Sequence, residues 1–284
     1  MCKVSVIIPC YNCGQYLNDA IESVKKQTFS DWEIIVIDDG STDQETINIL
    51  STLPCDSRIK LIRQGNNGPA HARNTGISQA KGELILPLDA DDTISPYYME
   101  EAVPLFEKND NLGIVYCRAQ KFGKETGEWI LPSYSAQNMA FDNVIFVSAF
   151  FKKSDWELVG GFPNYAYFGL EDYAFWLRLL RLGREVYKID KILFNYRIRD
   201  ISRTVLFCNN KDKLISTYAS IFRDNIDFFY KNAEGIYRYR FNNQMMHEKY
   251  DIRNIIYKIS PTLYSIVKRL WALYKKINRN DVDK

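Results

Sequence analysis

The most constraining feature of this chain is an apolar run that ends abruptly in carboxylates. Residues 84–88 read Leu-Ile-Leu-Pro-Leu, and Asp89, Asp91 and Asp92 follow directly. A buried strand that delivers acids at its carboxyl end is where open α/β sheets place their ligand sites. Clustered carboxylates repel one another, so a cation that neutralises them stabilises the cluster. A divalent ion that holds a diphosphate is the simplest reason to build such a site.

The same residues also have a purely structural interpretation. They would form a solvated loop in which Asp92 or Thr93 caps a helix that begins near Pro96. A second acidic strand end argues against it, because residues 32–37, apolar except for Glu33, lead straight into Asp38 and Asp39. Helix capping would have to account separately for the acids that follow each of the two strands, which makes it the weaker explanation. The sequence therefore favours a ligand site where these strands end.

The first hundred residues alternate between apolar strands and amphipathic helices. We expect strands at 4–8, 33–37, 59–63 and 84–88, and helices at 14–27, 46–53 and 70–80. This winding predicts an α/β fold with a mostly parallel central sheet flanked by helices, and ligands at the carboxyl ends of its strands. Beyond residue 113 the pattern is mixed, with strands expected at 113–121, 128–131, 185–189 and 192–197, and helices at 155–159 and 171–182.

Length and composition fit one such domain with an extension. The chain has 284 residues, of which 46% are hydrophobic and 25% charged, a globular composition. We place the α/β domain at 1–208 and a helical C-terminal extension at 209–284. The extension ends in a basic amphipathic segment, 262–284, which either lies on an anionic membrane surface or packs on the domain with its lysines solvated.

Several classes of protein are excluded or disfavoured. The net charge of +2 gives no nucleic-acid signature. The N-terminus turns polar too quickly for a signal peptide, and no run of 18 apolar residues suggests a membrane span, so we expect a cytoplasmic protein. The six scattered cysteines indicate reduced thiols.

One pair of cysteines needs separate treatment. Cys10 and Cys13 form a C-x-x-C pattern, for which a zinc or redox role needs a second ligand pair or a βαβ thiol context. No second C-x-x-C occurs, and the chain has only two histidines. We therefore expect neither a metal nor a redox function for this pair.

The absent motifs direct attention to carboxylate chemistry. No G-x-G-x-x-G follows the first strand and no P-loop occurs, which disfavours a dehydrogenase or a P-loop enzyme. Neither His71 nor His247 lies near a nucleophile elbow. A general base is therefore expected among the acids, and Glu171 and Asp172 open a helix directly after Gly169. The alternative for these two acids is ordinary electrostatics at a helix N-terminus.

Six motifs in order carry a resemblance to a known family. They are Pro9-Cys-Tyr-Asn12, Asp38-Asp-Gly-Ser41, Asn67-Gly68 with Ala72-Arg-Asn-Thr-Gly76, Asp89-Ala-Asp-Asp92, Gly160-Gly-Phe162 and Glu171-Asp172. Together they resemble glycosyltransferase family 2, the inverting, sugar-nucleotide-dependent enzymes with a GT-A fold, of the bacterial surface-polysaccharide type. The resemblance covers about residues 1–205.

The resemblance implies a nucleotide site along the strand ends. It places the nucleotide base and ribose against the segment that contains Pro9, Tyr11 and Asn12. The second acid after the second strand, Asp39, would bind the imide of a uracil-type base. Further residues have implied roles at the ribose, diphosphate and metal: Asp89 on the ribose, Arg73 near the diphosphate, and Asp91 on a Mn²⁺ or Mg²⁺ ion that bridges the diphosphate.

The resemblance also implies the reaction centre. Asp172 would be the catalytic base, and Glu171 would support hydroxyls of the donor or acceptor sugar. A sugar hydroxyl is a poor nucleophile, so a positioned carboxylate must take its proton as bonding develops. Relatives often carry Tyr-Arg-x-His after the last strands, where this chain has Tyr196-Arg-Ile-Arg199. Arginine cannot bind a cation but can neutralise a diphosphate, so Arg199 is either a phosphate clamp or a surface residue.

These features imply a transferase that moves a hexosyl or N-acetylhexosaminyl group. Its donor would be a UDP-sugar, and its acceptor a hydroxyl of a glycan or lipid-linked saccharide at the inner face of the plasma membrane. Two alternatives stay open. A sugar nucleotidylyltransferase would need a Gly-rich triphosphate loop that residues 8–14 do not supply. A non-catalytic sugar-nucleotide or membrane-binding module would have no need for Asp172.

Overall fold

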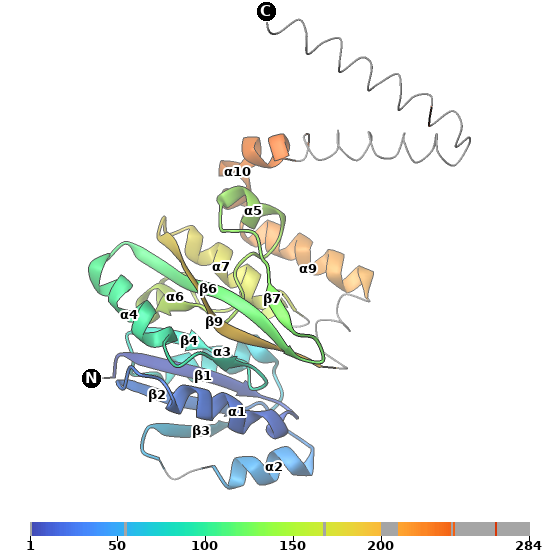
Figure 1. Ribbon diagram of the computed structural model, residues 1–284. Helices are drawn as coiled ribbons and strands as arrows, with labels where there is room; N and C mark the ends of the chain where they lie inside the picture. Colours follow the sequence, from blue (N-terminus) through green and yellow to red (C-terminus); the bar gives the residue numbers. More distant parts are fainter. Residues whose placement is uncertain are drawn as a thin grey trace, which may run out of the picture. The chain divides into compact units, whose positions relative to one another are not determined.

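The structure is a computed structural model that describes residues 2–53, 56–166, 169–199, 210–239, 241 and 265 (Figure 1). The chain divides into two compact units, Met1–Lys231 and Asn232–Lys284. Helices α9 (Lys211–Asp224) and α10 (Ile226–Lys231) fall in the first unit. The division at residue 208 stays a prediction.

The first half of the sheet is parallel. Strands β1 (Val4–Cys10), β2 (Trp32–Asp38), β3 (Ile59–Arg63) and β4 (Leu84–Pro87) lie in the order β3-β2-β1-β4. They alternate with α1 (Gly14–Lys25), α2 (Gln44–Ser51) and α3 (Pro69–Ser78). The register pairs Cys10 with Asp38, so the carboxyl ends of β1 and β2 meet at one edge. The α/β fold expected from the sequence is thereby confirmed.

Beyond β4 the sheet becomes mixed. Strand β8 (Phe150–Lys152) runs antiparallel between β4 and β6 (Leu112–Gly123), and β9 (Glu185–Ile198) runs parallel to β6. Two short strands complete the sheet: β5 (Thr93–Ile94) beside β9 and β7 (Gly127–Trp129) beside β6. The strands expected at 185–189 and 192–197 are one strand, because a bulge absorbs the interruption. Strands β5 and β8 are too short to give a periodic sequence signal.

Helix α7 (Glu171–Leu180) brings two acids to the edge of the sheet. The other helices of this half are α4 (Tyr98–Lys108), α5 (Ala136–Phe141), α6 (Lys153–Val159) and the 3₁₀ turn η1 (Asn164–Ala166). Most of α7 is buried, and Leu170 before it adopts a left-handed conformation with φ of 64°. Non-glycine residues adopt this conformation at a cost of order 1–2 kcal/mol, so packing must hold the turn that aims Glu171 and Asp172.

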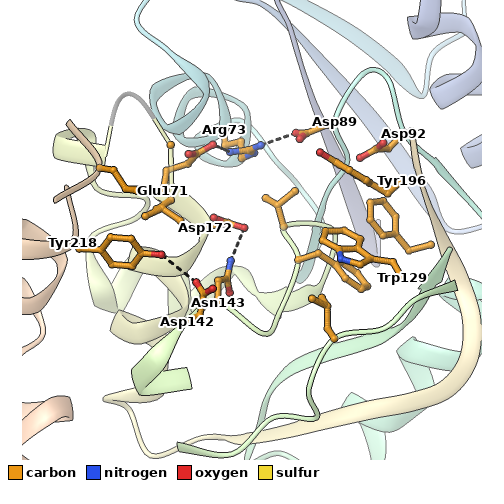
Figure 2. A pocket seen from close by; sticks show the side chains of 17 residues that line it. Arg73, Asp89, Asp92, Trp129, Asp142, Asn143, Glu171, Asp172, Tyr196 and Tyr218 are labelled. Carbon is orange, nitrogen blue, oxygen red and sulfur yellow. Dashed lines mark hydrogen bonds and ion pairs between the residues drawn. The ribbon is translucent and has the colours of Figure 1, made fainter. Parts of the chain in front are cut away.

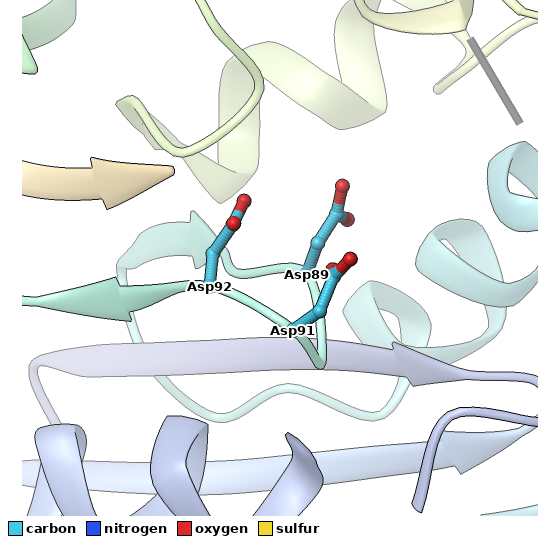
Figure 3. A group of neighbouring side chains, drawn as sticks. All are labelled: Asp89, Asp91 and Asp92. Atoms are coloured by element: carbon cyan, nitrogen blue, oxygen red, sulfur yellow. The ribbon is translucent and has the colours of Figure 1, made fainter. Parts of the chain in front are cut away.

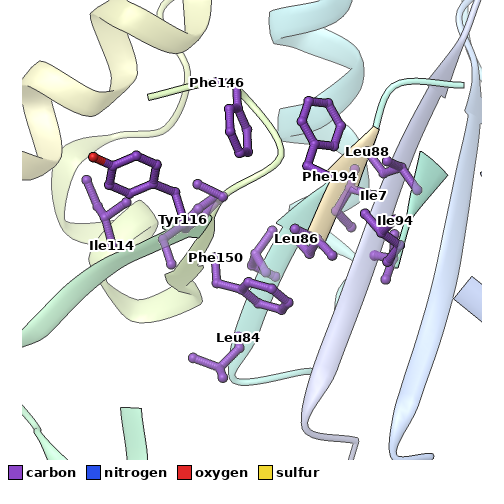
Figure 4. Close-up of a cluster of buried hydrophobic side chains, with 14 of the residues drawn as sticks. Ile7, Leu84, Leu86, Leu88, Ile94, Ile114, Tyr116, Phe146, Phe150 and Phe194 are labelled. Carbon is purple, nitrogen blue, oxygen red and sulfur yellow. The ribbon is translucent and has the colours of Figure 1, made fainter. Parts of the chain in front are cut away.

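One apolar core joins the two halves of the sheet (Figure 4). Ile7 of β1, Leu86 of β4 and Phe150 of β8 are all fully buried within it. Helix α3 lies especially close to the sheet, because a Cβ on Gly76 would come within 2.6 Å of both Ile7 Cγ2 and Ile37 Cδ1. As a result, α3, which contains Arg73, is held close against β1 and β2.

No helix among the described residues is both long enough and apolar enough to cross a lipid bilayer. The basic amphipathic segment 262–284, expected to touch either a membrane or the domain, lies outside the described residues except for residue 265.

Candidate active site

A cavity of about 440 Å³ lies where the end of β4, the start of α7 and the β7 hairpin converge (Figure 2). In Figure 2, Arg73 and Glu171 lie on one side of it and Trp129 and Tyr196 on the other, with Asp92 beside Tyr196. The lining includes Arg73, Asp89, Asp92, Glu171 and Asp172, together with Trp129, Phe146 and Tyr196. The structure thus brings the acids of β4 and α7, which are about eighty residues apart in sequence, to a single site.

The three acids after β4 form a tight carboxylate cluster (Figure 3). One carboxylate oxygen from each of Asp89, Asp91 and Asp92 lies within 4.8 Å of the others. Burial, reinforced by the neighbouring Asp charges, raises the pKa of Asp91 and Asp92. Three hard oxygen donors that repel one another suit a hard divalent cation. Asp92, which the sequence places in the acidic cluster without assigning it to the metal, is therefore a further candidate ligand.

Arg73 ties this cluster to helix α7. Its Nη2 lies 2.6 Å from Asp89 Oδ1 and its Nη1 lies 2.8 Å from Glu171 Oε1. The guanidinium is 1% exposed and lies over the ring of Phe162. A direct contact between Arg73 and a nucleotide stays a prediction. What the geometry shows is a buried clamp that fixes Asp89 and Glu171 relative to each other.

Asp172 lines the cavity beside Glu171 and is the acid of the two that Arg73 does not pair with. Its Oδ2 accepts a hydrogen bond of 2.8 Å from Asn143 Nδ2, and its Oδ1 accepts one of 2.8 Å from the backbone N–H of Tyr173. Burial, followed by the charge of Glu171, raises the pKa of Asp172 to about 7. A carboxylate with such a pKa is suited to general base chemistry near neutral pH. Asn143 is a site residue that no sequence pattern indicated.

Aromatic side chains form the opposite wall. The rings of Trp129 and Tyr196 lie 4.7 Å apart, and those of Phe146 and Phe194 stack at 4.5 Å. Trp129 comes from β7 and Tyr196 from β9, so the wall depends on the hairpin that the mixed half of the sheet adds. Aromatic faces with a few convergent polar groups are typical of small-molecule sites. The sequence of the hairpin, taken alone, does not predict this aromatic wall.

The residues expected at the nucleotide base hold loops together at the edge of the parallel half. Asp39 is 3% exposed and accepts backbone hydrogen bonds from Asn67 and Gly68 at 3.0 and 2.9 Å. Asn12, with φ of 50°, accepts one from the N–H of Thr42 at 2.8 Å. Tyr11 is 45% exposed, and Pro9 lies within β1. Contacts of these residues with a nucleotide stay predictions.

Arg199 lies against the carboxylate cluster. Its Nε is 2.8 Å from Asp91 Oδ2, and its guanidinium lies 5.7 Å from the centre of the Tyr16 ring. Arg197 braces the same region, since its Nε donates to the backbone carbonyl of Asp91 at 2.7 Å. A cation therefore already neutralises one of the carboxylates expected to bind metal.

Comparison with known proteins identifies the family. The sequence model of glycosyl transferase family 2 matches residues 5–163. A chondroitin synthase of Escherichia coli is 32% identical over 197 residues, which are 68% of this chain and 28% of that protein. An uncharacterized glycosyltransferase of Haemophilus influenzae is 31% identical over 252 residues, 82% of this chain and 76% of that protein. The chain belongs to glycosyltransferase family 2, as its motifs predict.

The chain spans only part of the length of several relatives, such as 30% of a hyaluronan synthase of Pasteurella multocida that is 26% identical over 97% of this chain. Solved structures confirm the GT-A fold. TarS of S. aureus in complex with UDP has a TM-score of 0.59 at 22% identity, over 69% of this chain and 60% of that one. The mannosyltransferase PcManGT of Pyrobaculum calidifontis, in complex with GDP-Man and Mn²⁺, has a TM-score of 0.60 at 20% identity, over 78% and 64%.

Proposed function

We propose that this chain is an inverting glycosyltransferase that moves a sugar from a nucleotide-diphospho-sugar, a UDP-sugar, to a hydroxyl of a saccharide acceptor. The observation that carries the proposal is the placement of Asp172. Its carboxylate faces the same cavity as Asp89 and Asp92, so a base and an acidic cluster suited to a cation share one site. Relatives named chondroitin synthase and hyaluronan synthase support a role in surface polysaccharide synthesis.

Asp172 would act as the general base. Its carboxylate takes the proton of the acceptor hydroxyl as that oxygen attacks the anomeric carbon. Attack opposite the leaving group inverts the configuration at that carbon. The hydrogen bond from Asn143 holds the carboxylate in the cavity, and the charge of Glu171 contributes to a pKa of about 7, so the base is available at neutral pH.

The carboxylates after β4 would hold Mn²⁺ or Mg²⁺. Asp91 and Asp92, with Asp89 beside them, supply oxygen donors that converge within 4.8 Å, and such a cation would offset charge that develops on the departing diphosphate. Arg199 adds a fixed positive charge at Asp91. Two proteins of the same fold were solved with ligands of this kind, TarS with UDP-GlcNAc and PcManGT with GDP-Man and Mn²⁺, which supports a nucleotide sugar and a divalent cation as the ligands proposed here.

The aromatic wall would bind the acceptor. Trp129 and Tyr196 offer apolar faces on which the C–H face of a sugar ring can pack. A glycan or a lipid-linked saccharide fits this description. For a lipid-linked acceptor, segment 262–284 would place the site at the membrane surface, and cosedimentation with anionic liposomes of the full chain and of a chain lacking this segment tests that contact.

The proposed function is tested by UDP release from a panel of UDP-sugars, with Mn²⁺ and with EDTA. We expect one donor to be hydrolysed or transferred with Mn²⁺, and little turnover with EDTA. The Asp172→Asn variant is the matched control, because it should bind UDP and release little of it from the sugar. A protein that neither turns over any donor nor binds UDP in calorimetry would contradict the proposal and favour a binding module for another ligand.

A further inference from the structure

The two cysteines of the C-x-x-C pattern lie side by side where β1 ends and α1 begins. Cys10 is the last residue of β1 and Cys13 is the N-cap of α1. Their Sγ atoms are 3.8 Å apart. The pair stands at the β1–α1 junction of a unit in which β1 and β2 are parallel. The pair therefore has the βαβ context that a redox role requires.

The two thiols differ in exposure and in acidity. Cys10 is 1% exposed, whereas Cys13 is only partly buried. A hydrogen bond from Cys10 lowers the pKa of Cys13, and a helix N-terminus acts in the same direction. By contrast, burial raises the pKa of Cys2 to about 11 and that of Cys117 to about 12. Cys13 is thus the more reactive thiol of the pair.

Closing the pair would change the shape of the loop between them. A disulfide has an S–S distance of about 2.05 Å, so the sulfurs must approach each other by more than an ångström from 3.8 Å. The loop contains Tyr11 and Asn12, and Asn12 Oδ1 accepts hydrogen bonds from the backbone of Thr42 and Asp43. Movement of Asn12 therefore disturbs the loop after β2 as well.

We propose that Cys10 and Cys13 form a reversible disulfide that weakens nucleotide binding, so that this chain is switched off by thiol oxidation. The oxidant is a low-molecular-weight disulfide. The Cys13 thiolate attacks one of its sulfurs and displaces a thiolate, which takes up a proton from solvent in place of the one that Cys13 lost. Cys10 then attacks Cys13 Sγ, and as its S–H bond breaks its proton passes to the second departing thiolate. Two protein thiols become one disulfide, and the oxidant becomes two thiols. The effect on binding rests on the proposed nucleotide site; the disulfide itself does not.

The test treats the full chain with oxidised glutathione and measures two quantities. Mass spectrometry of the intact protein and its peptides should show the loss of two hydrogen atoms and a Cys10–Cys13 link. Calorimetry should show UDP affinity at least about tenfold lower, a change of about 1.4 kcal/mol, restored by dithiothreitol. Cys117→Ser is the matched control and should behave like the unaltered chain.

Two variants separate the steps. Cys10→Ala should stop at a glutathione adduct on Cys13, and Cys13→Ser should acquire no adduct at position 10, because Cys10 is buried. Absence of the link in the oxidised chain, or a link that leaves UDP affinity unchanged, would overturn the proposal. If the reduced chain binds no UDP, the proposed function fails, and the mass measurement still decides whether the disulfide forms.

Discussion

Arg199 and Asp91 form an ion pair in which Nε of the arginine lies 2.8 Å from Oδ2 of the aspartate. The pair holds a guanidinium directly against a carboxylate that the proposed function assigns to a metal ion. Because a guanidinium repels a cation and attracts a phosphate, Arg199 would compete with a metal ion for Asp91. A bound diphosphate would satisfy both, since it can contact the ion and the guanidinium together.

Replacing Arg199 by alanine should therefore change metal and nucleotide binding in opposite directions. Without nucleotide, Mn²⁺ affinity should rise by roughly tenfold, because Asp91 loses its competing cation; this corresponds to about 1.4 kcal/mol. With EDTA, UDP affinity should fall. Titration of Mn²⁺ followed by electron paramagnetic resonance, together with calorimetry of UDP, measures both. Arg238→Ala, which breaks an exposed ion pair with Glu234, is the control. Unchanged affinities for Mn²⁺ and UDP would show that Arg199 contributes to the binding of neither.

Replacing Asp172 by asparagine should reduce transfer by about 10²–10⁴-fold, the usual contribution of a general base, while UDP affinity is kept. The pH profile of the unaltered chain gives a second check. Because burial raises the pKa of Asp172 to about 7, kcat/KM should fall tenfold per pH unit below about 7, where the carboxylate becomes protonated. A profile that is flat between pH 5 and 7 would assign the base to another group.

Asn143 should prove to be a positioning residue. Its amide oxygen accepts from the N–H of Ile145 at 3.2 Å, which turns its Nδ2 toward Asp172. A hydrogen bond to the ionised form lowers a carboxyl pKa. In Asn143→Ala the acid limb of the pH profile should therefore move to higher pH, and kcat should fall with little change in the KM of the donor. Asn138→Ala, which removes a contact with Ser133 in the same region, should leave the limb in place.

Arg73 should be essential for the geometry of the site even if it touches no substrate. In Arg73→Lys a single ammonium can satisfy only one of Asp89 and Glu171, which accept from two different nitrogens of Arg73. Losing one partner of a buried ion pair costs on the order of 3 kcal/mol, so Tm should drop by several degrees along with transfer. Arg238→Lys, in an exposed pair with Glu234, should leave Tm unchanged. An equal Tm for both variants would show that Arg73 is not a clamp.

Local patterns suffice to predict the acidic strand ends and the start of α7. Asp89, Asp91 and Asp92 follow an apolar run directly, and this adjacency survives in the structure because the run is a buried strand. The βα winding likewise predicts the parallel half of the sheet. It also places Cys10 and Cys13 between the first strand and the first helix, but only the structure shows that their Sγ atoms lie 3.8 Å apart.

The parts that sequence does not predict depend on contacts between distant segments. The approach of Asn143 to Asp172 joins an irregular loop to a helix 29 residues away, and nothing in either segment specifies the other. The pairing of β6 with β9 brings Tyr196 beside Lys121. Two-residue and three-residue strands such as β5 and β8 carry no periodicity of their own, so the mixed half of the sheet is set by packing.

Trp129 should determine how the acceptor binds. It is partly exposed, and its ring lies 4.7 Å from that of Tyr196 on the wall opposite Asp172. Removing an aromatic face that packs on a sugar ring should cost about 1 kcal/mol or more, so in Trp129→Ala transfer to added saccharide acceptors should fall several-fold through a higher acceptor KM. Hydrolysis of the donor by water needs no such wall and should persist. The control is Trp156→Phe, which removes the hydrogen bond that the Trp156 ring N–H donates to Asn74 outside the cavity. If Trp129→Ala reduced hydrolysis and transfer equally, the aromatic wall would serve the donor instead of the acceptor.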